Sequence, residues 1–264
     1  MLYIHENNYQ AKIKNNYNNK SEEIKKFYEE KYLKFKEQLN NIKFSNEDEN
    51  SFKKAAKLMD NYIKEINKFE NQIGIKSQSK FRSTFIEEIS TYLFKDIEPI
   101  KNGSLGIFNK GIFAGMKINN QLNIDILTKD VDFCIGKKVN LIIDNQSSIN
   151  LIIPIICVEV KTYLDATMFG EVKYSSMQIK NATPNARTYI LMEGIVVAEE
   201  KILAARHDNA LDEMFVLRNR GDNNQDPISF EVLKSYYKEI VKAIDESTIF
   251  EEIIYPGKLL KPNN

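Results

Sequence analysis

Cysteine is scarce in this sequence of 264 residues, which contains only Cys134 and Cys157. The two do not have the spacing of metal ligands and cannot build a disulfide framework, so they are expected to be reduced core residues. No apolar run approaches the roughly 18–20 residues that a membrane span requires. The first ten residues are polar and do not resemble a signal peptide. The sequence therefore predicts a soluble, cytoplasmic protein with no membrane partner.

Histidine is equally scarce, and His5 and His207 are far apart in the chain. Nucleases that hold their metal with histidine need a cluster of them, so that chemistry is disfavoured and His207 is expected in a surface turn. The phosphate-binding patterns GxxxxGK[ST] and GxGxxG are absent, and so is the GxSxG turn of serine hydrolases. A nucleotide cofactor and a serine nucleophile therefore have no support.

A surplus of charge of either sign is also missing, since 37 basic residues balance 37 acidic ones. This balance counts against a protein that binds nucleic acid through a general basic surface. The distribution is less even, because residues 1–80 hold 16 basic and 12 acidic residues. A neutral total is compatible with a nuclease, in which metal-binding carboxylates offset a basic groove.

Residues 1–76 are expected to form an N-terminal helical arm. The first 20 residues are polar and rich in asparagine, and no regular structure is expected there. Two stretches then place apolar residues at steps of three and four, from Ile24 to Ile42 and from Phe52 to Phe69. This spacing predicts two amphipathic helices, which we interpret as a hairpin. The arm serves either for packing or dimerisation, or as a basic surface along DNA.

Residues 77–264 are expected to form a second domain. A helix over 77–94 carries the adjacent acids Glu87 and Glu88. The glycine-rich segment 103–120 predicts a hairpin, and residues 122–143 predict a second pair of strands. The other expected elements are helices over about 165–179, 199–206 and 228–245, and strands over 186–198 and 213–219.

The run LIIPIICVEVK, residues 151–161, is central to this domain. Apolar residues at both odd and even positions indicate a strand that is buried on both faces. At its end, Glu159 and Lys161 share one face, roughly 6.5–7 Å apart. Burying both charges is costly unless their geometry is good. We therefore expect a ligand there, and a divalent metal with a phosphate is the natural candidate.

Asp132 lies upstream in the stretch VDFCIG, and a strand–turn–strand arrangement would bring it beside Glu159. Two neighbouring carboxylates repel each other unless a proton or a cation lies between them. Mg²⁺ prefers oxygen ligands, waters and substrate phosphate, and the carbonyl of Val160 can add one ligand. Lys161 is expected to orient or help deprotonate a water and to stabilise negative charge.

The triplet Glu-x-Lys by itself is weak support, because it occurs five times in the sequence. Only the triplet at Glu159 ends a buried strand that follows a strand carrying an aspartate. The alternative interpretation is a pair of charges at the solvated end of a strand.

Three stretches together, FRSTFIEE, KDVDFCIG and CVEVKTYLDATMFGE, resemble the PD-(D/E)xK nuclease superfamily. Within it, the sequence is similar to type II restriction endonucleases grouped with the Bpu-type and DdeI enzymes, over residues 77–245. The resemblance implies an α/β fold with a restriction-endonuclease-like core, a mixed sheet flanked by helices. It also implies Mg²⁺-dependent, sequence-specific cleavage of double-stranded DNA, with Asp132, Glu159 and Lys161 as the catalytic residues.

The resemblance further implies an acid on the preceding helix that holds a second metal or a water. Glu88 matches this position, with Glu87 as the alternative. Asp130 is the alternative to Asp132 if the strand register shifts by two, since both would then lie on one face. Val131 stands where the family pattern has proline.

Cutting both DNA strands requires two active sites, so a homodimer or a heterodimer with a related subunit is expected. A cognate methyltransferase of the same system would be a functional partner. Two other functions stay open: a repair or recombination nuclease of the same fold, and a non-catalytic DNA-binding protein. Five arginines are candidates for contacts to guanine or phosphate, each with an ordinary salt bridge as the alternative: Arg82, Arg187, Arg206, Arg218 and Arg220.

Overall fold

The computed structural model describes residues 2–75, 79–118, 120, 124–143, 147–205, 210–218 and 226–254. Arg206, His207 and Arg220, which were considered above, lie outside these residues. Across the described ranges, no helix combines the length and apolar character needed to cross a membrane.

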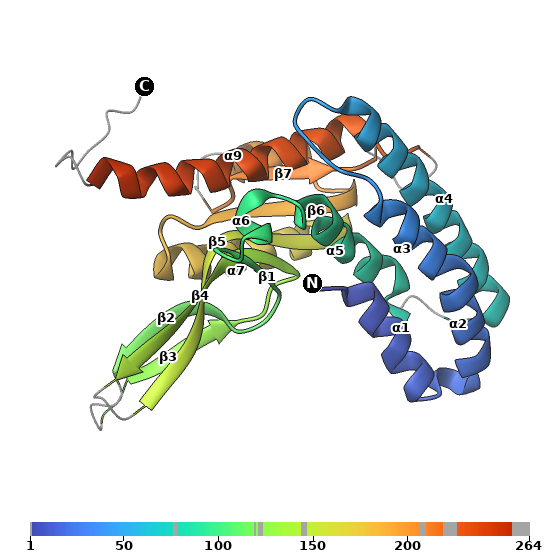
Figure 1. The fold of residues 1–264 in the computed structure, drawn as a ribbon, viewed down its shortest axis with the longest axis horizontal. Helices are drawn as coiled ribbons and strands as arrows, with labels where there is room; N and C mark the ends of the chain where they lie inside the picture. Colours follow the sequence, from blue (N-terminus) through green and yellow to red (C-terminus); the bar gives the residue numbers. More distant parts are fainter. Residues whose placement is uncertain are drawn as a thin grey trace.

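Helices and strands follow one another in the order shown in Figure 1. The N-terminal helices are α1 (Ile4–Lys14), η1 (Tyr17–Asn19), α2 (Ser21–Phe27), η2 (Tyr28–Tyr32), α3 (Leu33–Asn40) and α4 (Glu49–Ile73). There follow α5 (Phe81–Phe94), α6 (Glu98–Lys101), β1 (Gly106–Phe108), β2 (Ile112–Ile118), β3 (Ile124–Lys129), β4 (Phe133–Ile143) and β5 (Ser147–Leu164). The chain continues with α7 (Ala166–Ala182), β6 (Arg187–Ile195), α8 (Glu199–Ala205), β7 (Glu213–Val216) and α9 (Phe230–Ile254).

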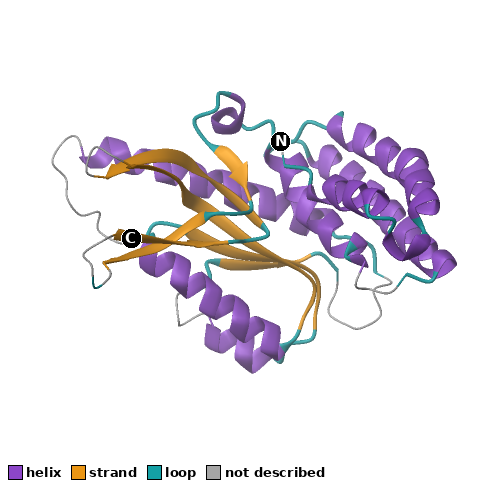
Figure 2. Ribbon diagram, turned by 90° about the horizontal axis from the view of Figure 1, so that it is seen from below, coloured by secondary structure: helices purple, strands orange, loops and turns teal. Residues whose placement is uncertain are grey.

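The strands form one mixed sheet with the order β1-β4-β5-β2-β3, to which β6 and β7 are added beyond β5. The long strand β5 connects the two halves. Residues 147–158 run antiparallel to β4, residues 156–164 run parallel to β6, and Ile152 pairs in parallel with Ile112 of β2. The expected mixed sheet flanked by helices is therefore confirmed (Figure 2).

The expected strand pairs within 103–120 and within 122–143 are wrong. The hairpin forms between β2 and β3, whereas β1 pairs with β4, and β4 pairs with β5. The glycines of 103–120 mark the turn that separates β1 from β2, where Gly111 has a φ of 67°. Sequence alternation identified the strands but carried no information about which neighbour each strand would choose.

A β-bulge interrupts the β4–β5 ladder where Gly136 faces Pro154. Pro154 has no N–H to donate, which is tolerated inside a sheet only at such irregular positions. The backbones approach so closely that a Cβ on Gly136 would lie 2.5 Å from the carbonyl oxygen of Ile153. After the bulge the ladder continues to the pair Phe133–Val158, which places the start of β4 beside the end of β5.

Helices cover both faces of the sheet. Val158 and Val160 belong to the hydrophobic cluster shared with α4, α5 and α9. Cys134 and Cys157 point to the other face, where they pack with Ile179 of α7. Both cysteines are buried and free, as expected. Because odd and even positions of β5 face opposite layers, Glu159 and Lys161 lie on the α7 side of the sheet.

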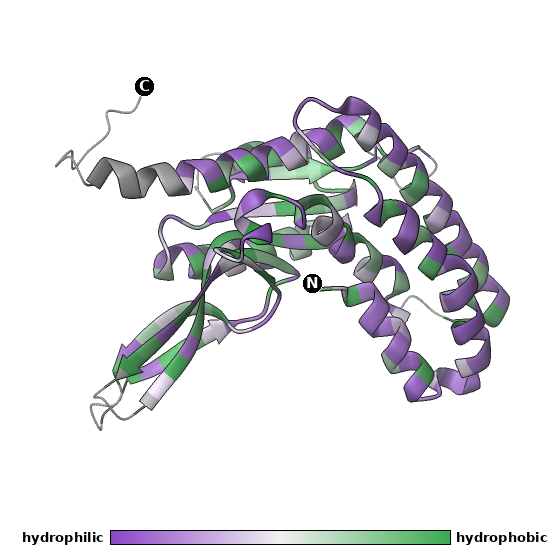
Figure 3. Cartoon of the chain, viewed as in Figure 1, coloured by the Kyte–Doolittle hydropathy of each residue, from purple (hydrophilic) through white to green (hydrophobic). Residues whose placement is uncertain are grey.

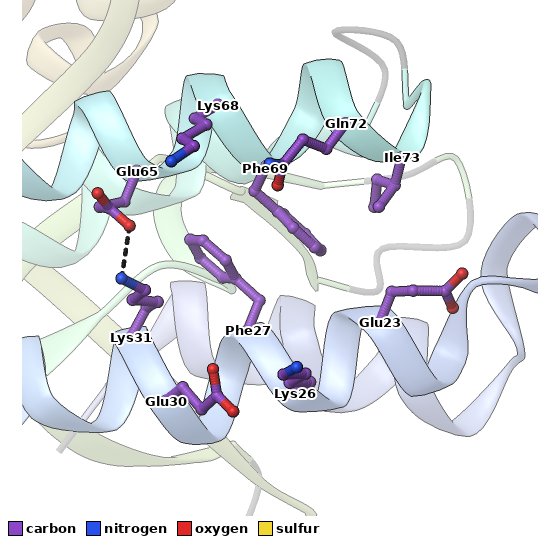
Figure 4. Close-up of a pocket in the computed structure, with 10 residues that line it drawn as sticks. All are labelled: Glu23, Lys26, Phe27, Glu30, Lys31, Glu65, Lys68, Phe69, Gln72 and Ile73. Atoms are coloured by element: carbon purple, nitrogen blue, oxygen red, sulfur yellow. Dashed lines mark ion pairs between the residues drawn. The ribbon is translucent and has the colours of Figure 1, made fainter.

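The predicted helical hairpin of the arm is confirmed. Phe27 stacks on Phe69 with ring centroids 4.2 Å apart, and Phe35 stacks on Tyr62 at 4.4 Å. Figure 4 shows this seam, where the ion pair of Lys31 with Glu65 closes one side of a pocket of about 310 Å³. The order of these contacts requires α4 to run antiparallel to the helices before it.

The absence of regular structure expected for residues 1–20 is wrong, because α1 forms there and packs on α5. His5 and Tyr9 are fully buried, and Tyr9 stacks on Phe81 with centroids 4.7 Å apart. Only these two positions of α1 are buried, so the sequence shows no apolar stripe. The arm shares one hydrophobic cluster with the sheet, and the boundary between residues 76 and 77 stays a prediction.

The ends of β2, β3 and β4 project from the body as a ribbon that contains many hydrophobic residues (Figure 3). Its exposed apolar side chains are Met116, Ile118, Ile124, Leu127, Leu141 and Ile142. Such a group of exposed apolar residues is typical of an interaction surface.

Candidate active site

Asp132, Glu159 and Lys161 meet at one edge of the sheet. Asp132 is the residue before β4, and the antiparallel pairing of β4 with β5 brings it next to the end of β5. The ammonium of Lys161 lies 3.2 Å from Glu159 Oε2 and 3.6 Å from Asp132 Oδ2. The sequence-based prediction of a shared face and of a neighbouring aspartate thus matches the geometry.

Val160 connects Asp132 to the strand. Its backbone N–H donates to Asp132 Oδ2 at 2.7 Å, beyond the last residue pair of β4 and β5. In a strand, the N–H and the C=O of one residue point to the same side. The carbonyl of Val160 therefore lies on the side of Asp132, where it can serve as an additional oxygen ligand.

Burial and mutual repulsion set the charges of this site. Burial raises the pKa of Glu159, the nearby Asp132 raises it further, and Lys161 opposes the shift. Burial by itself would lower the pKa of Lys161, but attraction to Asp132 and Glu159 outweighs it and raises that pKa. Lys161 is therefore a stable cation, and the two carboxylates favour a second positive charge between them.

Ser175 contacts the carboxylate of Glu159 from α7, the helix that covers this face of the sheet. Its hydroxyl donates to Glu159 Oε1 at 3.4 Å, and the side chain is buried. The sequence analysis missed this residue, because a serine in a helix carries no signal without knowledge of which strand the helix covers. The contact restricts the rotation of Glu159.

Glu87 of α5 lies close enough to this edge for Asp132 and Lys161 to affect its charge. Burial raises its pKa to about 7, Asp132 raises it and Lys161 lowers it. A carboxylate that responds to both residues lies within their electrostatic field. Glu87, the alternative kept open for the extra acid, therefore stays a prediction, which its electrostatic coupling to Asp132 and Lys161 supports.

The assignment of Glu88 as a metal ligand is wrong, because its carboxylate points away from Asp132 and into the arm. There it accepts hydrogen bonds from the backbone N–H groups of His5 and Glu6 and from the hydroxyls of Tyr32 and Tyr92. The four donors use the acceptor sites of the carboxylate. Glu88 is only 1% exposed, so it has no access to a ligand at the sheet edge.

Asp130, the alternative to Asp132, is placed elsewhere. Its Oδ1 accepts from the backbone N–H of Gly111 at 3.1 Å, in the turn before β2. Val131 separates the two aspartates and is buried. The register of β4 therefore brings Asp132, and not Asp130, to Glu159.

The described arginines are engaged in ion pairs. Arg82 and Arg218 both bind the fully buried carboxylate of Glu193, at 2.6 and 2.7 Å, and Arg218 also reaches Asp60 at 2.8 Å. Arg187 binds Asp212 at 3.0 Å. For these three residues the structure shows the alternative interpretation, a salt bridge.

The donor set at this edge fits Mg²⁺. Asp132, Glu159 and Val160 present oxygen atoms, the ligands that hard divalent cations prefer. Within the described residues, no three acidic, histidine or cysteine side chains converge closely enough to enclose a metal by themselves. Such a site would bind Mg²⁺ through two carboxylates and leave the remaining positions to water and substrate phosphate, which is the usual manner for this ion.

The chain was also compared with known proteins. The model of a family described as "Bpu10I restriction endonuclease" matches residues 78–226, more than half of the chain. Among solved structures, the chain is similar to one described as "native BbvCI A2B2 tetramer at low resolution". The TM-score is 0.69 and the identity 16%, over 92% of this chain and 95% of that one. At this identity the likeness shows the fold alone, including the N-terminal helices. No curated protein matches.

Proposed function

This chain belongs to the Bpu10I restriction endonuclease family, and we propose that it hydrolyses double-stranded DNA at a specific short site with Mg²⁺ as its cofactor. The match to this family confirms the resemblance to type II restriction endonucleases, and the chain is a site-specific deoxyribonuclease. The observation that carries the proposal is the convergence of Asp132, Glu159 and Lys161 at one sheet edge.

Asp132 and Glu159, with the carbonyl of Val160, would hold the metal. When bound there, Mg²⁺ makes a water more acidic and neutralises charge on the scissile phosphate. The protein residues prepare that position. Val160 fixes Asp132 through its N–H, and Ser175 restrains Glu159.

Lys161 acts as a cation in this proposal. Its raised pKa favours a protonated ammonium, which donates hydrogen bonds and accepts none. It would therefore orient the attacking water and stabilise the negative charge that develops on the phosphate.

Glu87 takes the role that the sequence analysis gave to Glu88. Its pKa is raised to about 7, so Glu87 gains or loses a proton near neutral pH. It would hold either a second metal or a water on the α5 side of the phosphate. A base whose pKa lies near the working pH is efficient at taking a proton from water.

We also propose that two chains act together, as a homodimer or as a heterodimer with a related subunit, because one active site cuts one strand. The apolar ribbon of β2, β3 and β4 is a surface that such a subunit would cover. A methyltransferase of the same system would protect the host site. Sizing by light scattering distinguishes a dimer from a monomer.

The test is cleavage of plasmid DNA by Glu159→Ala and Lys161→Ala. Each substitution should lower the cleavage rate about 100- to 1000-fold, which is the scale of removing one essential electrostatic group. Both variants should remain folded, with the far-UV circular dichroism spectrum of the wild type. Glu171→Ala is a matched control, because Glu171 and Lys173 repeat the same triplet on a helix.

Cleavage at the wild-type rate by either site variant would reject the role assignment. Cleavage without a preferred sequence would favour a repair or recombination nuclease. DNA binding by the wild type without any cleavage would favour the non-catalytic alternative.

A further inference from the structure

Two lysines lie where α1 of the arm meets the start of α5. Lys80 is the residue before α5, and Lys12 lies on the last turn of α1. Asn8, one turn before Lys12, donates to the carbonyl oxygen of Ser79 at 3.2 Å and to Thr84 Oγ1 at 3.3 Å. These contacts hold the face of α1 that carries Lys12 against the start of α5.

The ammonium of Lys12 is held in place by aromatic rings. It lies 3.7 Å from the ring centroid of Tyr17 and 5.6 Å from that of Phe81, the residue that follows Lys80. Ring contacts of this kind orient a cation without neutralising its charge. Within the described residues, neither Lys12 nor Lys80 forms an ion pair.

The two cations repel each other. Partial burial lowers the pKa of Lys12, and the charge of Lys80 lowers it further. Glu70 acts in the opposite direction on Lys12 and accepts a hydrogen bond from Ser79 Oγ at 2.5 Å. An anion placed between the two ammonium groups would remove this repulsion.

The position of Lys80 relative to Glu87 indicates which anion this is. Lys80 directly precedes α5 and Glu87 lies two turns into it, so the two are roughly 10 Å apart along the helix axis at 1.5 Å per residue. Phosphates on one strand of DNA advance about 3.4 Å along the axis per step. A duplex that lies along α5 with its scissile phosphate near Glu87 would thus bring a phosphate about three steps away to Lys80. The charge of Lys80 also reaches Glu87, where it lowers the pKa.

We propose that Lys12 and Lys80 bind the phosphate backbone of the DNA substrate a few steps from the cleaved bond. This inference rests on the proposed function and extends it, because it gives α1 of the arm a direct role in holding the substrate. Contacts to phosphate position a duplex and carry no sequence information. The pair would therefore contribute to affinity on any DNA sequence.

The experiment measures binding of linear, mixed-sequence double-stranded DNA by the cleavage-deficient Glu159→Ala chain in EDTA, at several salt concentrations. The test variant adds Lys12→Met and Lys80→Gly. Methionine keeps an unbranched side chain against Tyr17 and Phe81, and glycine suits the left-handed backbone at position 80, where φ is 58°. Neither change should weaken the fold.

The expected result is a salt dependence that becomes shallower by about 1.8 in the slope of log K against log salt, near 0.9 for each lost phosphate contact. A matched control replaces two exposed lysines far from this pair, Lys57→Met and Lys242→Met, which removes the same charge. The control should keep the slope of the parent. Lys12→Arg with Lys80→Arg should keep it too.

An unchanged slope in the test variant, or an equal loss in the control, would overturn the inference. No DNA binding by the parent chain would overturn it as well. The proposed function fails separately, if the wild-type chain with Mg²⁺ leaves DNA intact, because the binding experiment uses a chain that does not cut.

Discussion

Glu87 and Glu88 are neighbours on α5, yet their carboxylates lie in different surroundings. Glu88 is buried among four hydrogen-bond donors that come from the arm and from α5 itself. Glu87 is partly exposed and lies in the field of Asp132, Glu159 and Lys161. Adjacent residues on a helix point about 100° apart, so one helix presents one acid to the arm and the other to the site.

The comparison shows how the surroundings of a structural acid differ from those of the acid that we propose to act in the site. Glu88 interacts mainly with the groups that donate hydrogen bonds to its carboxylate. The neighbouring His5 is so deeply buried that the pKa of its imidazole falls to about 3. Glu87 sits among like charges, which is unfavourable for the fold unless a cation or a proton is added. Uncompensated charge of this kind is typical of catalytic sites.

The largest effect on stability is expected from Glu88→Ala. The change leaves the N–H groups of His5 and Glu6 and two tyrosine hydroxyls without their acceptor in a buried space. Such losses cost about 3–5 kcal/mol in the free energy of unfolding. Urea unfolding measures this value.

Glu87→Ala is the matched control for that experiment, since it removes an acid from the adjacent position of the same helix. It should not lower the free energy of unfolding. Equal destabilisation by the two alanine variants would show that the surroundings of the two acids do not differ as described.

The next largest effect is a gain in stability, in contrast to the loss expected for Glu88→Ala, and it is expected from Glu87→Gln. The pKa of Glu87 is raised from 4.5 to about 7 in the folded chain, so the folded state binds a proton that the unfolded state releases between these values. The contribution of Glu87 to the free energy of unfolding is therefore complete below pH 4.5 and is lost as the pH rises through 7. Glutamine removes this loss, worth about 1–3 kcal/mol after allowance for partial exposure.

Unfolding in EDTA between pH 4.5 and 8.5 tests this prediction. The variant should be more stable than the wild type at pH 8, and the difference should vanish near pH 4.5. Cleavage should fall in the same variant. A variant that is no more stable at pH 8 would mean that Glu87 is not held near like charges.

The smallest effect is expected from Ser175→Ala, which removes one long hydrogen bond to Glu159. A hydrogen bond as long as this one contributes about 0.5–1.5 kcal/mol, so cleavage should fall by about tenfold or less. Ser176→Ala is the control, because Ser176 is buried next to it on α7. If cleavage by the two variants depends on the Mg²⁺ concentration in the same way, Ser175 has no part in the site.

Sequence reasoning found the part of the site that lies on strands. Alternation along β5 placed Glu159 and Lys161 on one face, and the preceding strand supplied Asp132. It failed on α5, where eleven of the fourteen residues are buried. A helix enclosed on nearly all sides has no polar face, so periodicity could not tell which of two adjacent acids pointed to the sheet edge.

The N-terminal segment escaped prediction for a related reason. His5 and Tyr9 are its buried residues, and polar asparagines surround them in the sequence. Their burial depends on α5 and on the tyrosines of the hairpin, contacts far apart in the chain. The choice of strand partners failed likewise, because pairing is decided by tertiary packing.

The most direct test of the central claim is digestion of a long, mixed-sequence DNA by the purified chain, with Mg²⁺ and with EDTA, beside Lys161→Ala. The account predicts discrete fragments from the wild type with Mg²⁺ and intact DNA in the other tubes. Discrete fragments from Lys161→Ala, or from the wild type in EDTA, would contradict it.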